Sequence, residues 1–599
     1  MNFGYVKTMA ISPEIKVCDV DFNEKSIISQ LEFAKSKDAE VVVFPELVLT
    51  GSTANDLLGY EVLIDRVERA LINIARYLEG KNMLVFIGAP LIVEGVIFST
   101  AVCMFNGEIL GVVSDSENQT VRRINIGEYK DVLFGNNLIL KNELMDKMRV
   151  GVIVGEKKNN NLDYKNCSLI VNIISQNEYS GIDESIKRSV EYISKEFDCA
   201  FVSCNSGIGE STTDFVFSGF SLIAEKGEVL KKSKPFADKY IIADVDLSIK
   251  AHKKNIEESS VTISFSQQIN GQTNRKYERL PFVKSGEEDL IIEIQAQGLA
   301  RRIAHTNANK VVLGLSGGLD STLALIVCDR AMSILKRDKK DILALTMPCY
   351  GTTSRTLENS IKLAKSYGVS IKKIDITKSV TRHLKDIGHD GKSHDPAYEN
   401  AQARERTQVL MDTANMHNGF VVGTGDLSEL ALGFATYNGD HMSMYAVNAS
   451  IPKTLVRHLT EYTARISKGK KKATLLDILD TPVSPELIPS ENNTIKQVTE
   501  DIVGPYILHD FFIYNMLKRG FSPRKIYHIA VNTFEGEFDA KTILKWLKIF
   551  VRRFFTQQFK RSCMPDGVMA TEISLSPRVG FSMPSDAISK LWLDQLENL

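Results

Sequence analysis

The sequence has few of the features that mark membrane, secreted or metal-scaffold proteins. No run of apolar residues approaches the roughly 18–20 that a transmembrane helix needs, so we expect no membrane span. The eight cysteines are scattered, without a CxxC pair or a metal-ligand spacing, which argues against a disulfide framework or a structural zinc site. The first residues, Met1–Lys7, lack the charged, apolar and small-residue regions of a signal peptide. These absences favour a cytoplasmic protein with reduced, mostly buried thiols.

The chain also lacks an excess of either charge. Its 73 Lys and Arg residues nearly balance its 74 Asp and Glu residues, which leaves a net charge of −1. This balance gives no electrostatic basis for a nucleic-acid or membrane partner. The apolar and charged fractions are those of a globular protein, and 599 residues are too many for one hydrophobic core. We therefore expect two large domains, or three smaller ones.

The first half alternates short apolar runs with stretches of helical periodicity, which predicts a layered α/β domain with buried sheets. Turns at Asn106-Gly107 and Lys226-Gly227 add antiparallel strand pairs. The pattern weakens between about Asp246 and Glu288, where Ser, Asn, Gln and Lys are frequent. A second α/β unit follows, with a helix from about Glu287 and a strand from Lys310. The expected domains are 1–263 and 289–599, joined by a linker at 264–288.

The most informative stretch is Val311–Ala324, where a buried strand runs into Ser316-Gly317-Gly318 and a helix starts at Asp320-Ser321-Thr322. Glycines let the backbone approach a ligand, and the helix N-terminus favours an anion. The hydroxyls can donate to phosphate oxygens. Asp320 would repel a bare phosphate, so we expect it to bind Mg²⁺ on that phosphate. The alternative is a capped turn that binds nothing; the paired glycines, the hydroxyls and the acid argue against it.

This stretch is not a Walker motif, which ends in Gly-Lys-Ser/Thr. It resembles the SGGxDS loop of the ATP-pyrophosphatase group, which includes NAD, GMP and asparagine synthetases and tRNA-modifying enzymes, and the loop alone does not choose among them. Further motifs, in order through nearly the whole second half, resemble the glutamine-dependent NAD synthetase family. They are residues 399–406, 422–433, 436–445, 447–454, 484–489, 504–512 and 559–562.

The resemblance implies an N-terminal nitrilase-like αββα sandwich and a C-terminal doubly wound parallel sheet. It implies that ATP, with Mg²⁺, adenylates the nicotinate carboxylate of deamido-NAD, and that ammonia then displaces AMP. It also implies a homo-oligomer. The site residues that it implies fall into four groups. The catalytic residues are Asp320, Glu429 and Lys453, and the Mg²⁺ ligands are Asp320 and Glu429. The ATP-binding residues are Gly314, Leu315, Ser316, Gly317, Gly318, Leu319, Asp320, Ser321, Thr322, Thr424 and Lys453. The residues that bind deamido-NAD are Asn400, Arg404, Glu429, Phe434, Ala435, Thr436 and Tyr437. Read in isolation, Arg404 could instead lie on a solvated helix face.

One departure from the family lies in the loop after Pro565-Asp566-Gly567. The family usually has a Pro-Lys pair there, and the lysine reaches the dinucleotide, whereas this chain has Val568-Met569. The loss of that charge predicts weaker dinucleotide binding, unless Lys560 or Arg561 substitutes for it.

The first half resembles the nitrilase-like amidase domain fused to these synthetases, on residues 44–51, 106–113 and 209–214. Amidase chemistry needs a Glu base, a Lys for the oxyanion and a Cys nucleophile. Glu46 matches the base, but Asp115 stands in the region of the lysine and Gly155 in place of the cysteine. The family's Leu-Pro-x-Tyr loop, which holds glutamine, is replaced by residues 117–121. The other cysteines of this half that lie in or beside apolar runs are expected to be structural; they are Cys103, Cys167, Cys199 and Cys204.

The sequence therefore predicts an NAD synthetase with an inactive amidase domain, which uses free ammonia or ammonia supplied by a separate protein. One alternative is a glutamine-hydrolysing NAD synthetase with an unrecognised nucleophile. Another is a regulatory pseudoenzyme that only binds a dinucleotide. The Ser316–Ser321 loop and Glu429 argue against the second alternative, because a scaffold need not retain acids for a metal.

Overall fold

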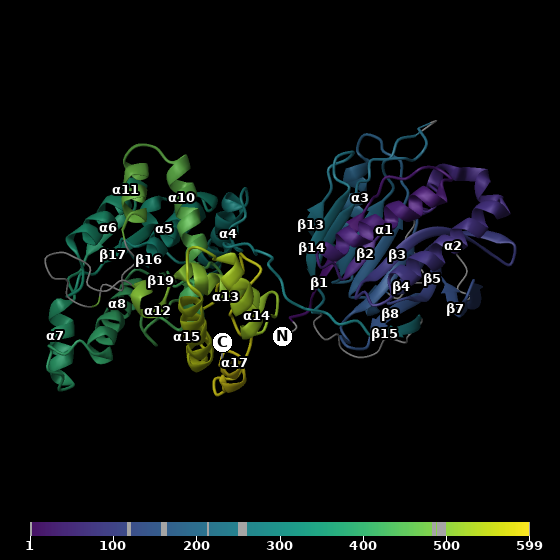
Figure 1. Ribbon diagram of the computed structural model, residues 1–599. Helices are drawn as coiled ribbons and strands as arrows, with labels where there is room; N and C mark the ends of the chain where they lie inside the picture. Colours follow the sequence, from purple (N-terminus) through teal and green to yellow (C-terminus); the bar gives the residue numbers. More distant parts are fainter. Residues whose placement is uncertain are drawn as a thin grey trace. The chain divides into compact units, whose positions relative to one another are not determined.

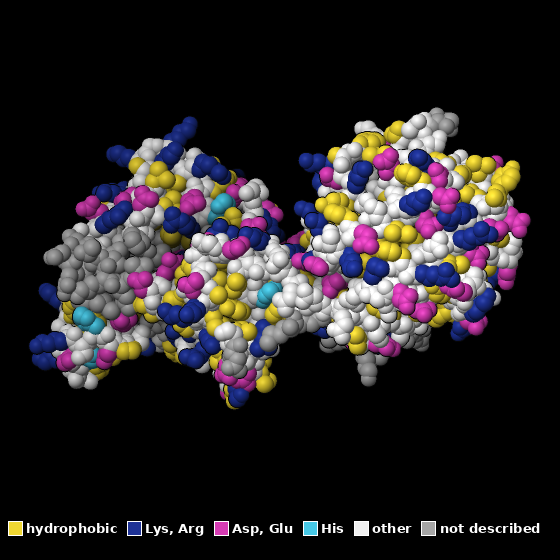
Figure 2. Space-filling view, in the orientation of Figure 1, with side chains coloured by type: hydrophobic (Ala, Val, Ile, Leu, Met, Phe, Trp, Pro, Cys, Tyr) yellow, Lys and Arg dark blue, Asp and Glu magenta, His cyan; other side chains and the backbone are white. Residues whose placement is uncertain are grey.

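The computed structural model describes residues 3–116, 121–156, 164–212, 215–248, 260–481, 487, 499–597 and 599. It divides into two compact units, Met1–Asn274 and Arg275–Leu599 (Figure 1). The boundary lies within residues 264–288, the expected linker, whose first part belongs to the first unit. On the face in Figure 2, basic and acidic side chains are intermixed over each unit. Within the described residues, no helix has the length and apolar character that crossing a membrane requires.

Two sheets form the first unit, counted over its described residues. The eight-stranded sheet contains, in spatial order, β14 (Tyr240–Asp246), β1 (Tyr5–Ile11), β2 (Val41–Val43), β3 (Leu84–Val93), β4 (Val96–Phe105), β5 (Glu108–Ser114), β7 (Tyr129–Gly135) and β6 (Arg122–Ile126). The seven-stranded sheet contains β13 (Glu228–Lys232), β12 (Leu222–Glu225), β11 (Ala200–Asn205), β10 (Leu169–Ile174), β9 (Arg149–Val154), β8 (Leu138–Asn142) and β15 (Val261–Phe265).

Alternating side chains place these sheets face to face between helices. In β2, Val41 and Val43 pack in the core between the sheets, whereas Val42 points to the outer core formed with α1 (Val20–Ser36) and α2 (Glu61–Tyr77). On the second sheet, Ile170 points outward to α3 (Ile182–Glu196). The order helix, sheet, sheet, helix confirms the predicted nitrilase-like αββα sandwich.

The second unit is built on a sheet with the order β18 (Ser370–Lys373), β17 (Ile342–Thr346), β16 (Lys310–Gly314), β19 (Gly419–Gly423) and β20 (Tyr445–Ala446). Every neighbouring pair among these strands is parallel. The chain moves outward from β16 through β17 to β18 and then returns to β19 on the other side of β16. This reversal confirms the predicted doubly wound sheet, and it places the topological switch point between β16 and β19.

Helices surround this sheet. Val312, Leu345 and Val421 share a core with α7 (Thr377–Asp386) and α8 (Pro396–Met416). The other helices of this part are α4 (Glu288–Thr306), α5 (Leu319–Ile334), α6 (Ser354–Tyr367), α9 (Leu427–Leu432), α10 (Lys453–Ile466) and α11 (Gly469–Leu479). Of these, α5 and α6 contact the strands, and α4, α10 and α11 pack on those two helices. The C-terminal part adds α12 (Thr499–Val503), α13 (Tyr506–Leu517), α14 (Pro523–Thr533), α15 (Ala540–Thr556), α16 (Gln558–Arg561) and α17 (Lys590–Asp594). Of these, α13 and α15 both contact α9, which carries part of the site.

Candidate functional site

The candidate site lies at the carboxyl ends of β16 and β19, where the switch point brings two strand-to-helix loops together. The first loop joins β16 to α5, and the second joins β19 to α9. In an open parallel sheet, the crevice outside the strand ends at such a point is the expected ligand position. The loop found in the sequence, Gly314–Thr322, and the motif around Glu429 therefore face the same crevice.

The first loop has the backbone of an anion-binding turn. Gly317 has φ +89, and a Cβ there would lie 2.3 Å from the carbonyl oxygen of Thr356, so both the conformation and the space require glycine. Gly318 is the N-cap of α5, a helix of 16 residues whose free N–H groups favour an anion. The hydroxyls of Ser321 and Thr322 donate to the Gly318 carbonyl at 3.1 and 2.8 Å, so in this structure they brace the turn.

The second loop holds two acids through a capping box. The Glu429 backbone N–H donates to Asp426 Oδ1 at 2.8 Å, and the Asp426 N–H donates to Glu429 Oε2 at 3.4 Å. The two carboxylates therefore keep fixed positions relative to α9. Asp426 was missed from the sequence, although an Asp three residues before a Glu at a helix start is the signal of such a box.

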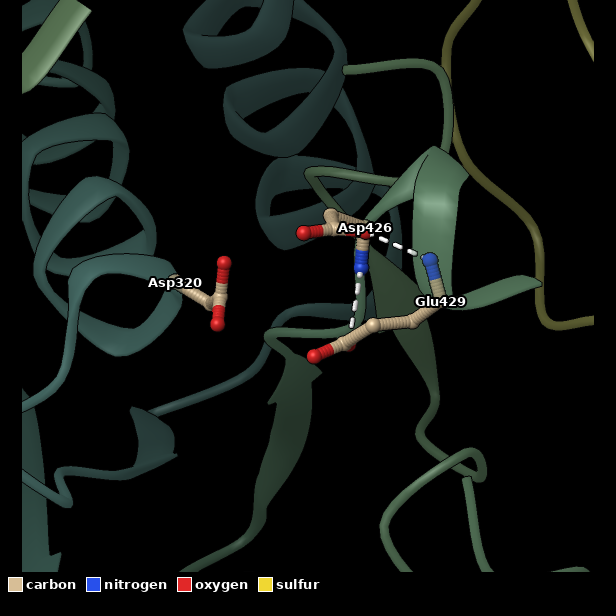
Figure 3. Close-up of side chains that lie close together, drawn as sticks. All are labelled: Asp320, Asp426 and Glu429. Atoms are coloured by element: carbon tan, nitrogen blue, oxygen red, sulfur yellow. Dashed lines mark hydrogen bonds between the residues drawn. The ribbon is translucent and has the colours of Figure 1, made fainter. Parts of the chain in front are cut away.

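Three carboxylates and one ammonium meet in the crevice. Lys453 Nζ lies 2.7 Å from Asp320 Oδ2, 2.8 Å from Asp426 Oδ2 and 3.0 Å from Glu429 Oε1. Figure 3 shows the three acids pointing toward one another from the two loops, and one oxygen of each lies within 4.8 Å of the others. Lys453 is 4% exposed and Asp426 is fully buried. We name Asp320, Asp426 and Glu429 the acid triad.

Burial sets the protonation equilibria of these groups. It raises the pKa of Glu429 to about 7 and that of Asp426 well above its usual value, against the pull of Lys453. Burial alone would lower the pKa of Lys453, but the three nearby carboxylates outweigh it and raise that pKa. With all four groups ionised, one ammonium leaves two negative charges uncompensated.

The acid triad fits a divalent cation. Its donors are carboxylate oxygens, which Mg²⁺ prefers. Asp320 Oδ1 is buried and, among the described residues, accepts no hydrogen bond. The residues present can therefore hold an Mg²⁺ ion.

Hydrogen bonds from buried side-chain amides and hydroxyls hold the two loops and the start of α10 in place. The Asn448 side-chain amide donates to the Asp320 carbonyl at 3.0 Å and to the Thr424 carbonyl at 3.1 Å, so one side chain links the two loops. The Ser428 hydroxyl donates to Asp510 and accepts from the Lys453 backbone N–H at 2.8 Å. These bonds fix the first turn of α10, from which the Lys453 side chain extends.

The residues expected to hold deamido-NAD also come together. The turn Phe434–Tyr437 follows α9, and the Thr436 hydroxyl donates to Asn400 Oδ1 at 2.7 Å. Arg404 is exposed, and its Nε donates to the Tyr437 carbonyl at 3.3 Å, so it faces solvent and also contacts the turn. The Phe434 N–H donates to the Glu429 carbonyl at 2.9 Å, which connects the turn to the acid triad through α9.

The two cations that precede the missing lysine most closely in the sequence, Lys560 and Arg561, both donate hydrogen bonds to backbone carbonyls. Lys560 Nζ donates to the carbonyls of Gly433 and Ala435 at 2.7 and 2.6 Å. Arg561 is 1% exposed and donates to carbonyls at the end of α9. Both side chains therefore satisfy the C-terminal carbonyls of α9, while Met569 is 51% exposed.

The charged groups around Glu46 in the first unit are acidic, whereas an amidase centre needs a cation beside the Glu base. Glu46 Oε1 accepts from the Ser99 hydroxyl at 2.7 Å, and burial raises the pKa of Glu46 to about 7. The charged neighbours that act on this pKa, Asp115 and Glu156, are themselves acids and raise it further. Among the described residues, no ion pair and no hydrogen bond joins Glu46 to a lysine or a cysteine.

Gly155 occupies the position of the expected nucleophile. It follows β9 with φ +82, and a Cβ added there would meet no atom of the described residues within 4 Å. Cys103 and Cys204 lie on strands, fully buried, where burial raises the pKa of both thiols; that of Cys204 rises to about 12. Neither thiol is suited to form a thiolate. Residues 117–120, where the glutamine-holding loop is replaced, lie outside the described residues, as do most of residues 484–489.

The fold and the site together define a class of protein. It has a nitrilase-like sandwich joined to a parallel-sheet unit, and the acid triad lies at the switch point of that sheet. Residues 291–484 match the family model described as NAD synthase. The glutamine-dependent NAD(+) synthetase of Mycobacterium leprae is 33% identical over 669 aligned positions, covering 99% of this chain and 98% of its own. The chain therefore belongs to the glutamine-dependent NAD synthetase family.

More distant relatives match over a similar extent. The glutamine-dependent NAD(+) synthetase of Thermotoga maritima is 24% identical, covering 90% of this chain and 94% of its own. A solved glutamine-dependent NAD(+) synthetase from Cytophaga hutchinsonii is 18% identical, with a TM-score of 0.43, covering 99% of this chain and 100% of its own.

Proposed function

We propose that the second unit is an ammonia-using NAD synthetase that takes ATP and Mg²⁺. The nicotinate carboxylate of deamido-NAD attacks the α-phosphorus of ATP and pyrophosphate leaves. Ammonia then attacks the carbonyl carbon of the adenylate, AMP leaves with the pair of electrons from the broken C–O bond, and the nitrogen releases one proton to solvent. The observation that carries the proposal is the acid triad beside the N-terminus of α5, in a chain that belongs to this family.

The residues of the crevice have distinct tasks in this reaction. Asp320, Asp426 and Glu429 would hold the Mg²⁺ ion, which neutralises the charge that builds on the phosphates. The N-terminal amides of α5 and the Gly317 turn stabilise phosphate oxygens, and Lys453 supplies a point charge to them. The turn Phe434–Tyr437, held by Asn400 and Arg404, positions deamido-NAD.

We propose further that the first unit does not hydrolyse glutamine. Amide cleavage through a thiolate needs a nucleophile at the end of β9 and a cation for the oxyanion. Gly155 offers no nucleophile, and Asp115 and Glu156 would oppose the negative charge of the intermediate. The unit would then serve assembly of a homo-oligomer, and ammonia would come from solution or from a separate protein.

A second candidate function is glutamine-driven NAD synthesis, which the names of the relatives favour. The two are distinguished by giving the purified protein ATP, deamido-NAD and either ammonium chloride or glutamine. We expect NAD, AMP and pyrophosphate with ammonium, and neither NAD nor glutamate above background with glutamine. Absence of NAD with both nitrogen sources would instead support a pseudoenzyme.

A further inference from the structure

The oxygens of the acid triad are nearly all in use. The capping box occupies Asp426 Oδ1 and Glu429 Oε2, which accept backbone N–H groups. The remaining oxygens of these two acids, Asp426 Oδ2 and Glu429 Oε1, both contact Lys453 Nζ, and so does Asp320 Oδ2. Among the described residues, Asp426 Oδ2 has this ion pair but no hydrogen bond, and Asp320 Oδ1 has neither.

A divalent cation in the acid triad would compete with Lys453 for the same carboxylates. Mg²⁺ binds carboxylate oxygens at about 2.1 Å, and Lys453 Nζ already lies 2.7–3.0 Å from one oxygen of each acid, so the two cations would be close neighbours. Their like charges would also repel at this separation, where burial weakens solvent screening. One oxygen alone, Asp320 Oδ1, is too little for a protein-held ion.

Hydrogen bonds hold the carboxylates of Asp426 and Glu429 and the backbone of Asp320, whereas the Lys453 ammonium lies at the end of a flexible stem. Asp426 and Glu429 are locked by the capping box, and the carbonyl of Asp320 is held by Asn448. Lys453 reaches the triad through four methylene groups, and its ammonium also lies 5.2 Å from the Tyr506 ring. A nucleotide phosphate would offer this ammonium a new anionic partner.

We propose that Lys453 is a built-in cation that occupies the acid triad until a nucleotide binds, so that the divalent ion enters together with the nucleotide. Binding of ATP transfers the ammonium from the carboxylates to the phosphates and opens the triad to the metal. The inference rests on the proposed ATP and Mg²⁺ site. It adds a binding order and a competitive role for Lys453 in the free protein.

Mn²⁺ binding to the full chain tests this proposal. Electron paramagnetic resonance measures the bound Mn²⁺ with and without a non-hydrolysable ATP analogue, and the Mn²⁺ that the analogue binds by itself is subtracted. In the wild type, the analogue is expected to tighten Mn²⁺ binding about 10- to 100-fold, a coupling within the range known for linked sites. Without nucleotide, Lys453→Met should bind Mn²⁺ at least about 10-fold more tightly than the wild type does without nucleotide. The matched control is Lys310→Met, which removes an ammonium paired with Asp341 at the other end of β16.

Equal Mn²⁺ affinity of the wild type with and without the analogue would overturn the inference. So would a folded Lys453→Met protein, checked by thermal unfolding, whose affinity without nucleotide equals that of the wild type. If that variant does not fold, the wild-type coupling decides alone. Absence of Mn²⁺ binding under every condition would refute the proposed metal site itself, and NAD formation from ammonium tests the proposed function separately.

Discussion

Replacing Glu46 by glutamine should stabilise the protein at neutral and alkaline pH. Burial raises the pKa of this carboxyl from 4.5 to about 7, and Asp115 and Glu156 raise it further. The folded state therefore holds a proton that the unfolded state has already released. The stability contributed by the protonated carboxyl is complete below about pH 4.5, declines as pH rises, and is lost once pH passes about 7.

The size of the effect follows from the shift in pKa. The difference between a pKa of 4.5 and one of about 7 corresponds to about 3 kcal/mol of unfolding free energy at pH 8 and to less than about 1 kcal/mol at pH 5. Glutamine is neutral at both values and keeps an oxygen for the Ser99 hydroxyl. Its NH₂ group can donate to a neighbouring carboxylate. The penalty present at pH 8 should therefore disappear in Glu46→Gln.

Thermal unfolding of the wild type and of Glu46→Gln at pH 5 and pH 8 measures this difference. For a unit of this size, about 3 kcal/mol corresponds to roughly 5–10 °C in Tm. Glu40→Gln is the contrasting control, because both oxygens of Glu40 accept backbone N–H groups, from Lys7 and Asn270, and the amide would destabilise the protein at both pH values. Equal Tm values of wild type and Glu46→Gln at pH 8 would refute the reasoning. Loss of ammonium-driven NAD formation in Glu46→Gln would refute the assignment of this pocket as inactive.

Three further outcomes follow from the site. Asp320→Asn or Glu429→Gln should lower NAD formation at least about 100-fold, equivalent to a few kcal/mol of transition-state stabilisation, and near-normal turnover in either variant would contradict the metal assignment. Met569→Lys should lower KM for deamido-NAD and leave KM for ATP nearly unchanged, because one charge-assisted phosphate contact is worth about 1.5–3 kcal/mol; an unchanged KM for deamido-NAD would show that this loop does not contact the dinucleotide. Gly155→Cys alone should give no glutaminase activity, since Asp115 remains and φ +82 strains any side chain there; glutamate release by this variant would count against the argument.

Local sequence patterns predicted the structure correctly where a single segment contains both the residues that set its fold and the residues that face the site. The strand, turn and helix at Lys310–Ala324 form as the glycines and the apolar run predict, and the doubly wound sheet follows the family resemblance. Glu429 and Lys453 lie in the crevice beside Asp320, as the motifs suggested. Their chemical roles there stay predictions.

Other features depend on contacts between distant segments, which no local pattern records. Asp426 is an ordinary helix cap by sequence, and only the approach of Lys453 makes it part of the charge cluster. Lys560 was considered as a substitute for the missing lysine, but the fold directs it to the end of α9. The stretch around Val261–Phe265 has weak periodicity, yet it pairs in parallel with β8 and completes the second sheet.

An isotope competition tests the central claim most directly, namely that this chain makes NAD from ammonia and cannot use glutamine. The purified protein receives ATP, deamido-NAD, ¹⁵N-ammonium chloride and an equal concentration of glutamine with an unlabelled amide. The mass of the NAD formed then reports the source of its amide nitrogen. We expect NAD labelled with ¹⁵N throughout and no glutamate above background. A substantial unlabelled fraction, accompanied by an equivalent amount of glutamate, would show that the first unit hydrolyses glutamine.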